Sequence, residues 1–232
     1  MAMSVHVTMG GMLWPAGRAV AVAYTRVPDA CGTALPRLVE RLPAAEQDRA
    51  ARFRLDDDRA RFTFGRLLLR QLIGGRGSLD IEESGRPIVV GSRSPLFVSL
   101  THSGRYVAAA LARRPVGIDV EACRGGFASD GLVARVCSPV ELSRLDALAG
   151  EARDRAFMTI WVRKEAYGKA LGVGVGFDLR SVTVGPTGDR AQGVGGRWSI
   201  VDLDLDPGYA SALVVAGGRA SIRLEAVDPA AL

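Results

Sequence analysis

The chain has 232 residues, a net charge of +5 and a sequence pI near 9.5. Hydrophobic side chains make up 48% and charged side chains 24% of it, which excludes intrinsic disorder and allows one large core or two small ones. No apolar run is long enough to span a bilayer and residues 1–17 lack a signal-peptide pattern, so we expect a cytoplasmic protein without membrane association. The positive charge favours an anionic ligand or partner, although the arginine excess also fits a coding bias.

The cysteines, Cys31, Cys123 and Cys137, are odd in number and far apart in sequence. None is accompanied by histidine at the spacing of a metal site. We therefore expect buried, reduced thiols, not disulfides or zinc ligands.

Residues 18–24 have side chains of alternating character and include β-branched and aromatic ones, which predicts a strand. A helix is predicted from Leu42 to about Phe53, and a long core helix is predicted to begin at the aspartates 56–58 and end at Gly74. A turn at 84–87 follows. The next predicted elements are a strand at 96–100, a hairpin turn at Gly104 and Arg105, and a return strand at 106–112.

The second part begins with a predicted strand at 116–121. Ser138, Pro139 and Glu141 fit a helix capping box, which favours Glu141 as a capping residue over Glu141 as a ligand. A helix is predicted over residues 151–171, stopped by the glycines at 172 and 174. The remainder predicts strands near residues 180–184, 197–203, 210–216 and 219–225.

A faint internal repeat runs through these elements. Residues 61–70 resemble 156–165, and the hairpin segment 104–111 resembles 208–215. The pattern predicts an α+β protein with two similar α/β halves, residues 1–113 and 114–232, joined near the sequence Arg-Arg-Pro. A cleft between two such halves would suit a ligand.

Both lysines of the chain, Lys164 and Lys169, fall within residues 161–169, although the chain has 30 basic residues. An ammonium group is a compact charge that can give up its proton, which arginine cannot do. This placement indicates a site that needs lysine.

Carboxylates flank these lysines in the predicted structure. The period of two in a strand puts Asp119 and Glu121 on one face, and the period of four in a helix puts Trp161, Glu165 and Lys169 on one stripe. Three oxygen donors without His or Cys favour Mg²⁺ or Mn²⁺ over zinc. Taken alone, each of these charged pairs is more often part of a solvated surface, and a tryptophan is more often part of the core. Only their combination indicates a metal site.

Three arginines and a histidine are candidates for binding phosphate. Arg49 and Arg52, three apart on a helix, could hold a phosphate monoester together with Arg61, but surface arginines of no special function fit the same pattern. His102, at a strand end between hydroxyl-bearing residues, could either satisfy a turn or donate to a phosphate.

Four motifs occur together in order: Gly-Arg-Pro at 85–87, Thr-His-Ser-Gly-Arg-Tyr at 101–106, Val-Gly-Ile-Asp-Val-Glu at 116–121, and Trp-Val-Arg-Lys-Glu-Ala-Tyr-Gly-Lys at 161–169. In this combination the chain resembles the surfactin-type (Sfp-like) 4′-phosphopantetheinyl transferases over about residues 42–184. The resemblance implies two halves related by a pseudo-twofold axis, with coenzyme A and a divalent metal ion between them. It also implies an enzyme that transfers phosphopantetheine from coenzyme A to a serine of an apo acyl or peptidyl carrier protein and releases adenosine 3′,5′-bisphosphate.

The resemblance further implies roles for individual residues. Asp119, Glu121 and Glu165 match the metal-binding acids, Lys169 matches the lysine near the diphosphate, and Glu165 and Lys169 are the expected catalytic pair, with Glu165 taking the serine proton directly or through a water. The remaining expected contacts are with coenzyme A, through Arg49, Arg52, Arg61, Arg86, Pro87, Thr101, His102, Asp119, Lys164 and Lys169. Glu46 departs from the family pattern because a relative has lysine there.

Carrier proteins of polyketide, nonribosomal peptide or fatty acid synthases are the expected partners. A monomer is expected because two fused halves already supply the interfacial cleft. Two alternatives are a Mg²⁺-dependent phosphodiesterase or nuclease, which would hydrolyse nucleic acid without coenzyme A, and a non-catalytic carrier-binding or nucleic-acid-binding module. The presence of all three acids and both lysines disfavours a non-catalytic module, and the scarcity of aromatic residues among the basic ones disfavours nucleic-acid binding.

Overall fold

The structure is a computed structural model that describes residues 5–7, 19–29, 31–32, 34–123, 125–173, 176, 178–185, 198–218 and 220–232. The chain divides into two compact units, residues 1–113 together with 221–232, and residues 114–220. The division between Arg113 and Arg114 falls at the expected join. Residues 221–232, however, lie with the first unit and not, as expected, with the second.

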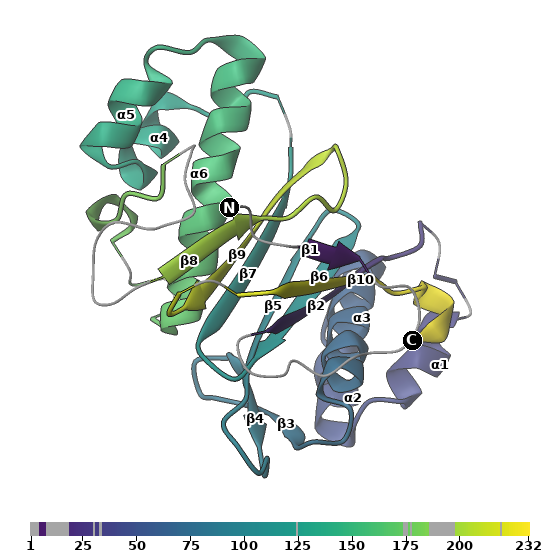
Figure 1. Cartoon of the computed structure of the whole chain (residues 1–232). Helices are drawn as coiled ribbons and strands as arrows, with labels where there is room; N and C mark the ends of the chain where they lie inside the picture. Colours follow the sequence, from purple (N-terminus) through teal and green to yellow (C-terminus); the bar gives the residue numbers. More distant parts are fainter. Residues whose placement is uncertain are drawn as a thin grey trace. The chain divides into compact units, whose positions relative to one another are not determined.

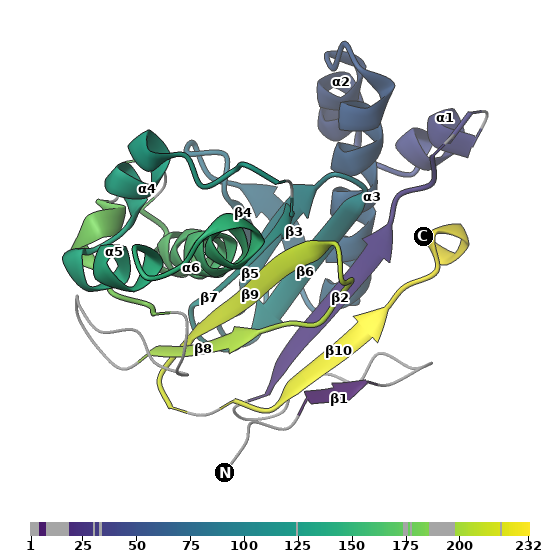
Figure 2. The same cartoon turned by 90° about the horizontal axis from the view of Figure 1, so that it is seen from above.

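The first unit is built on a five-stranded mixed sheet in the order β1-β10-β2-β6-β5 (Figures 1 and 2). The strands β1, β10 and β2 are parallel, and β2, β6 and β5 are antiparallel. The predicted hairpin turn is confirmed, because Ser103 pairs with Tyr106 and Gly104 adopts φ 53°. The bounds are β1 Val5–Val7, β2 Val20–Arg26, β5 Phe97–Ser103, β6 Tyr106–Ala112 and β10 Ile222–Ala226.

Among its described residues, this unit has three α-helices, α1 Ala34–Glu40, α2 Ala44–Ala51 and α3 Asp56–Ile73, and a 3-10 helix at Pro229–Ala231. The predicted long core helix is confirmed as α3, which begins with three aspartates and ends at Gly74 in the left-handed region. Acidic residues stabilise a helix N-terminus and glycine adopts a positive φ at low cost, so both ends follow from the sequence. Phe64, Leu68 and Leu69 of α3 are buried in the core with Val107 and Leu111 of β6.

A small hairpin of β3 Ser78–Ile81 and β4 Pro87–Val90 completes the unit. The predicted turn at 84–87 joins these strands, and Gly85 has φ 84° there. The strands themselves were not predicted, because they are four residues long and have no fully buried residue, so they carry little periodic signal.

The second unit is an antiparallel sheet in the order β7-β9-β8, with α6 packed against β7 and β9. Its elements are β7 Val116–Ala122, α4 Asp130–Val136, α5 Pro139–Leu145, α6 Gly150–Leu171, β8 Trp198–Asp202 and β9 Tyr209–Ala216. The predicted helix 151–171, its stop at Gly172 and the strand at 116–121 are confirmed, whereas Gly174 lies outside the described residues. The predicted strand at 180–184 is wrong, because Leu179–Ser181 form a 3-10 helix and only Thr183 makes an isolated bridge.

The two units repeat one path of the chain. In each, a first strand leads to a long helix, then to a second and a third strand, and the third strand lies between the other two. The path is β2-α3-β5-β6 in the first unit and β7-α6-β8-β9 in the second, and all the pairings within it are antiparallel. The shared topology supports the faint repeat in the sequence.

Within the described part of the chain, no helix combines the length and the apolar character needed to cross a membrane. The cysteines are free, as expected, but only Cys137 is buried; Cys123 is exposed and Cys31 is half-buried. Burial raises the pKa of the Cys137 thiol to about 11, which leaves it protonated and unreactive at neutral pH.

Candidate active site

The backbone of α6 lies directly against β7 at Gly117. A Cβ atom at this position would collide with the carbonyl oxygen of Ala166 and crowd the backbone nitrogen of Ala170. Strand residues two apart share a face, so Asp119 and Glu121 lie on the side of β7 that α6 covers. Glycine thus allows the close approach that brings a helix over two carboxylates.

The ammonium group of Lys169 on α6 lies 2.6 Å from Oδ1 of Asp119 and donates a hydrogen bond to it. The Asp119 side chain is only 5% exposed, whereas that of Lys169 is 32% exposed. The strand and the helix are therefore joined by a charge pair with one buried and one accessible member.

Glu165 lies one helical turn before Lys169 and belongs to the same electrostatic cluster. Burial raises the pKa of its carboxyl group above the usual range, Asp119 and Glu121 raise it further, and Lys169 acts in the opposite direction. Electrostatic interactions thus link Glu165 to Asp119, Glu121 and Lys169, and their joint role in one site stays a prediction. A carboxylate with a raised pKa is a better proton acceptor than an ordinary one.

The donor chemistry of this cluster fits a hard divalent cation. Carboxylate oxygens are the ligands such ions prefer. A cation would offset the repulsion from Asp119 and Glu121, which adds to burial in raising the pKa of Glu165. In the present arrangement, however, the described residues contain no group of three or more His, Cys, Asp or Glu side chains close enough to hold a metal ion. The acids suit a metal ion in type and charge, while their side chains are not yet gathered around one point.

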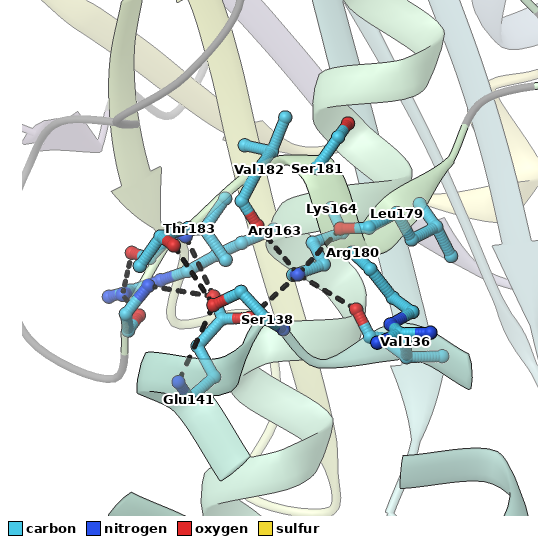
Figure 3. A network of polar contacts seen from close by, with 12 residues as sticks. Val136, Ser138, Glu141, Arg163, Lys164, Leu179, Arg180, Ser181, Val182 and Thr183 are labelled. Carbon is cyan, nitrogen blue, oxygen red and sulfur yellow. Dashed lines mark hydrogen bonds and ion pairs between the residues drawn. The ribbon is translucent and has the colours of Figure 1, made fainter. Parts of the chain in front are cut away.

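Lys164 does not have the position expected of a coenzyme A contact. Its side chain is 0% exposed, and its ammonium group lies 2.6 Å from Oε2 of Glu141, which is also 0% exposed (Figure 3). The same ammonium donates to the carbonyl oxygens of Val136, Leu179 and Val182 at 2.7 to 2.8 Å. The expected ligand contact is corrected to an internal one, because the ammonium is enclosed by protein acceptors.

Trp161 begins the stripe that continues with Glu165 and Lys169. Its ring lies 5.9 Å from that of Phe127 and 6.3 Å from that of Phe157, measured between centroids. These contacts assign it to the packing of the second unit, in line with the reading of a tryptophan here as core.

In the first unit, Arg61 is tied to the β5-β6 hairpin that carries His102. Its guanidinium group pairs with Asp58 at 2.5 Å and donates to the carbonyl oxygen of Gly104 at 3.1 Å. Arg61 therefore contacts the turn two residues after the exposed His102, although it is far from it in sequence. Thr101, the neighbour of His102, is 4% exposed and offers little surface to a ligand.

Arg49 on α2 and Arg52, the residue that caps the end of α2, are both exposed. The guanidinium of Arg49 lies 5.7 Å from the ring centroid of Phe62, and Arg66 lies 5.2 Å from the same ring. Glu46 pairs with Arg66 at 3.6 Å and with Arg70 at 3.1 Å. The residue that departs from the family pattern thus pairs with two arginines of α3 and offsets one of their two positive charges, a pairing that was not predicted from the sequence.

Arg86 and Pro87 lie at the turn of the β3-β4 hairpin and are half-buried. The backbone carbonyl of Arg86 accepts from the amide of Glu82, which closes the turn. The expected adenine segment is thus an ordered hairpin end.

An acidic strand beneath a helix that carries a glutamate and a lysine is a candidate site for phosphate chemistry, and comparison with known proteins identifies the family of the chain. The sequence profile described as the 4′-phosphopantetheinyl transferase superfamily matches residues 115–213. The 4′-phosphopantetheinyl transferase HetI of Nostoc sp. is 33% identical over 205 residues, which cover 83% of this chain and 86% of that protein. The 4′-phosphopantetheinyl transferase Sfp of Bacillus subtilis is 27% identical over 192 residues, which cover 78% of this chain and 84% of that protein.

This chain therefore belongs to the 4′-phosphopantetheinyl transferase family. Among solved structures, it is similar to Thermotoga maritima holo-(acyl-carrier-protein) synthase, at 21% identity and a TM-score of 0.34, over 45% of this chain and 64% of that one. That structural likeness is too slight to define the fold, and family membership stands on the sequence relatives.

Proposed function

We propose that this protein transfers the 4′-phosphopantetheine group of coenzyme A to a serine of an apo acyl or peptidyl carrier protein, and that it is of the surfactin type. The observation that carries the proposal is the ion pair of Asp119 and Lys169, which joins the acidic strand to the helix of Glu165. Family membership supplies the class of reaction, and this ion pair supplies charges of both signs next to a candidate base.

In the proposed reaction, the serine oxygen attacks the phosphorus on the pantetheine side of the diphosphate. The bond from this phosphorus to the bridging oxygen breaks, and adenosine 3′,5′-bisphosphate leaves with that oxygen and its electron pair. Glu165 accepts the serine proton, directly or through a water. Lys169 stabilises or protonates the leaving phosphate, because its ammonium is partly exposed beside the acids.

A divalent cation, Mg²⁺ or Mn²⁺, is part of the proposal. Asp119, Glu121 and Glu165 would hold it through oxygen atoms. When bound, it would neutralise charge on the two phosphates of the substrate. Lys169 now pairs with Asp119, so we expect the lysine to turn toward substrate phosphate once the acid has another positive partner.

In the first unit, we propose that His102, Arg49, Arg52 and Arg61 meet the 3′-phosphate of coenzyme A. We further propose that Arg86 and Pro87 meet its adenine. Glu46 pairs with both Arg66 and Arg70 and offsets one of their two positive charges, so these two arginines attract an anion less than their charge alone suggests.

The finer assignments follow the family and the sequence. Carrier proteins of polyketide, nonribosomal peptide or fatty acid synthases are the proposed partners, and a cytoplasmic monomer is the proposed form. Lys164 is left out of the proposed ligand contacts because its ammonium is enclosed by protein acceptors.

Incubation of the protein with an apo carrier protein, coenzyme A and Mg²⁺ tests the proposal, with intact-mass measurement of the carrier. We expect one phosphopantetheine group to be added, and no addition without coenzyme A or with a chelator present. A carrier whose mass stays unchanged, together with cleavage of a nucleic acid or phosphodiester substrate, would replace the transferase with the hydrolase alternative.

A further inference from the structure

Three consecutive residues of α6 reach three different parts of the second unit. Arg163 contacts Asp202 at the end of β8, Lys164 contacts Glu141 on α5, and Glu165 is coupled to the acids of β7. Successive residues of an α-helix point about 100° apart, so these directions follow from 3.6 residues per turn. The two residues before the candidate base are both anchored by charge.

The anchor of Lys164 is extensive. Its ammonium has a carboxylate and three carbonyl oxygens around it, all within 2.6 to 2.8 Å, and Figure 3 shows these contacts converging from separate segments. An ammonium has three protons, so every one of them has an acceptor. The lysine can leave this position only by giving up buried hydrogen bonds.

Glu141, the partner of Lys164, is itself held from several sides. Its Oε2 accepts from the backbone amide of Ser138 at 2.9 Å, which forms half of the capping box of α5. Its Oε1 accepts from the amides of Val184 and Gly185 at 2.8 and 3.2 Å. The carboxylate therefore fixes the start of α5 and the segment after the 3-10 helix relative to Lys164.

Arg163 provides a second anchor on another side of the helix. Its guanidinium forms a forked pair with Asp202, at 2.7 Å from Nε to Oδ1 and 2.6 Å from Nη2 to Oδ2. It also donates to the carbonyl oxygens of Val184 and Gly185. Its side chain is 5% exposed, so this pair is largely shielded from solvent on the arginine side.

We propose that Lys164 and Glu141, assisted by Arg163 and Asp202, are positioning residues that set the rotation of α6 about its own axis. Two anchors on different sides of a helix prevent this rotation, whereas contacts between apolar side chains are non-directional and leave more freedom. The inference rests on the proposed function, in which Glu165 takes the proton of the carrier serine.

The sensitivity of the site to such a rotation is large. A glutamate carboxylate lies about 6 Å from the helix axis, so a turn of about 20° would displace it by about 2 Å. Misplacement of a reacting group by about 1 Å can cost about 100-fold in rate. A device that fixes the rotation of α6 therefore acts on the chemistry without touching the substrate.

The test is the double variant Lys164→Met with Glu141→Gln, which removes both charges together. Methionine keeps most of the volume of lysine, and glutamine keeps an oxygen for the amides of Val184 and Gly185. The matched control is Arg155→Met, which removes an exposed ion pair with Glu151 on the same helix. Transfer kinetics, thermal melting and crystal structures are compared for the wild type and both variants.

We expect kcat of the double variant to fall by about tenfold to 100-fold, with KM for coenzyme A changed by less than about threefold. The assay is run well below the melting temperature of every protein, so loss of folded enzyme does not contribute. We also expect the carboxylate of Glu165 to be displaced relative to Asp119 in the crystal structure of the double variant. The control should match the wild type in both measurements.

An unchanged kcat, or an unmoved Glu165, would overturn the positioning role, and so would a loss of activity explained entirely by the fraction of unfolded protein. The crystal comparison needs no catalysis, so it decides on positioning even when the wild type fails to modify a carrier. Such a failure in the wild type would count against the proposed function alone.

Discussion

The ammonium of Lys169 and the carboxylate of Asp119 form an ion pair at 2.6 Å, with the acid almost fully buried and the lysine partly exposed. Glu165 lies within the field of both charges, and they act on its pKa in opposite directions. A divalent cation entering this cluster would therefore compete with Lys169 for Asp119. The lysine would then be available to the phosphates of a substrate.

Replacement of Lys169 by arginine separates charge from proton transfer. Arginine can keep an ion pair with Asp119, but its guanidinium does not give up a proton and is broader than an ammonium. We expect Lys169→Arg to keep coenzyme A affinity within about threefold and to lower kcat by about 100-fold. Binding calorimetry and single-turnover mass measurements check the two parts, and full turnover in this variant would remove the proton of Lys169 from the mechanism.

Asp119→Asn should abolish metal-dependent transfer. The variant lacks the negative charge of one proposed carboxylate ligand of the cation, and it removes the carboxylate that pairs with Lys169. We expect activity at saturating coenzyme A to fall by about 100-fold or more at all Mg²⁺ concentrations. Asp130→Asn is the control, because Asp130 is 95% exposed and pairs only at the surface with Arg153. A Mg²⁺ titration of Asp119→Asn that matches the wild type would mean that the cation binds elsewhere.

Glu165→Gln should stabilise the metal-free protein at neutral pH. The folded state raises the pKa of Glu165 above its ordinary value of 4.5, so the folded protein binds this proton more tightly than the unfolded chain does. The ionised form therefore costs stability above the folded pKa, and this cost disappears as the pH falls below 4.5.

We expect the melting temperature of Glu165→Gln to exceed that of the wild type by a few degrees at pH 7, since solvent screens part of the effect. The difference should shrink steadily on acidification. Melting curves in chelator from about pH 4 to about pH 8 provide the measurement, because a carboxyl group with a raised pKa titrates within this range. A difference that grows toward low pH would contradict the assigned direction, while transfer activity should be lost throughout.

Gly117→Ala should separate α6 from β7. The added methyl group would meet the carbonyl oxygen of Ala166, and backbone atoms of a packed helix can move only together. Overpacking of this kind costs about 1–3 kcal/mol, which lowers the melting temperature by several degrees in a protein of this size.

Gly131→Ala provides the matched control, because a Cβ at Gly131 on α4 meets nothing within 4 Å. It should be neutral or slightly stabilising, since alanine favours helix more than glycine does. Thermal melts of both variants give the comparison. Equal melting temperatures for Gly117→Ala and the wild type would show that the contact of α6 with β7 tolerates an extra atom.

The sequence predicted α3, α6 and β7 because each has a strong periodic pattern, and the two helices end in glycine. The capping box at Ser138 was predicted because it depends on residues three apart. The short helices α1 and α4 were not predicted, since seven residues with few buried side chains carry little periodic signal.

Part of the candidate site could also be predicted from the sequence. Alternation in the strand placed Asp119 and Glu121 on one face, and helical spacing placed Glu165 and Lys169 on one stripe. The enclosed position of Lys164 could not be predicted from spacing, because its acceptors on Val136 and Leu179 are 28 and 15 residues away. Local patterns determine which face a side chain occupies, whereas the long-range packing of other segments determines whether a ligand can reach it.

The strand β10 pairs in parallel with β1 and β2, so residues from near the end of the chain complete a sheet that begins near its start. Ile222 and Leu224 are buried in it at 0% and 4% exposure. During synthesis on the ribosome, residues 114–220 emerge before this strand, so the second unit can fold while one edge of β2 still lacks its neighbour. An unpaired strand edge can pair with other chains, so β10 protects β2 from such pairing once it is in place.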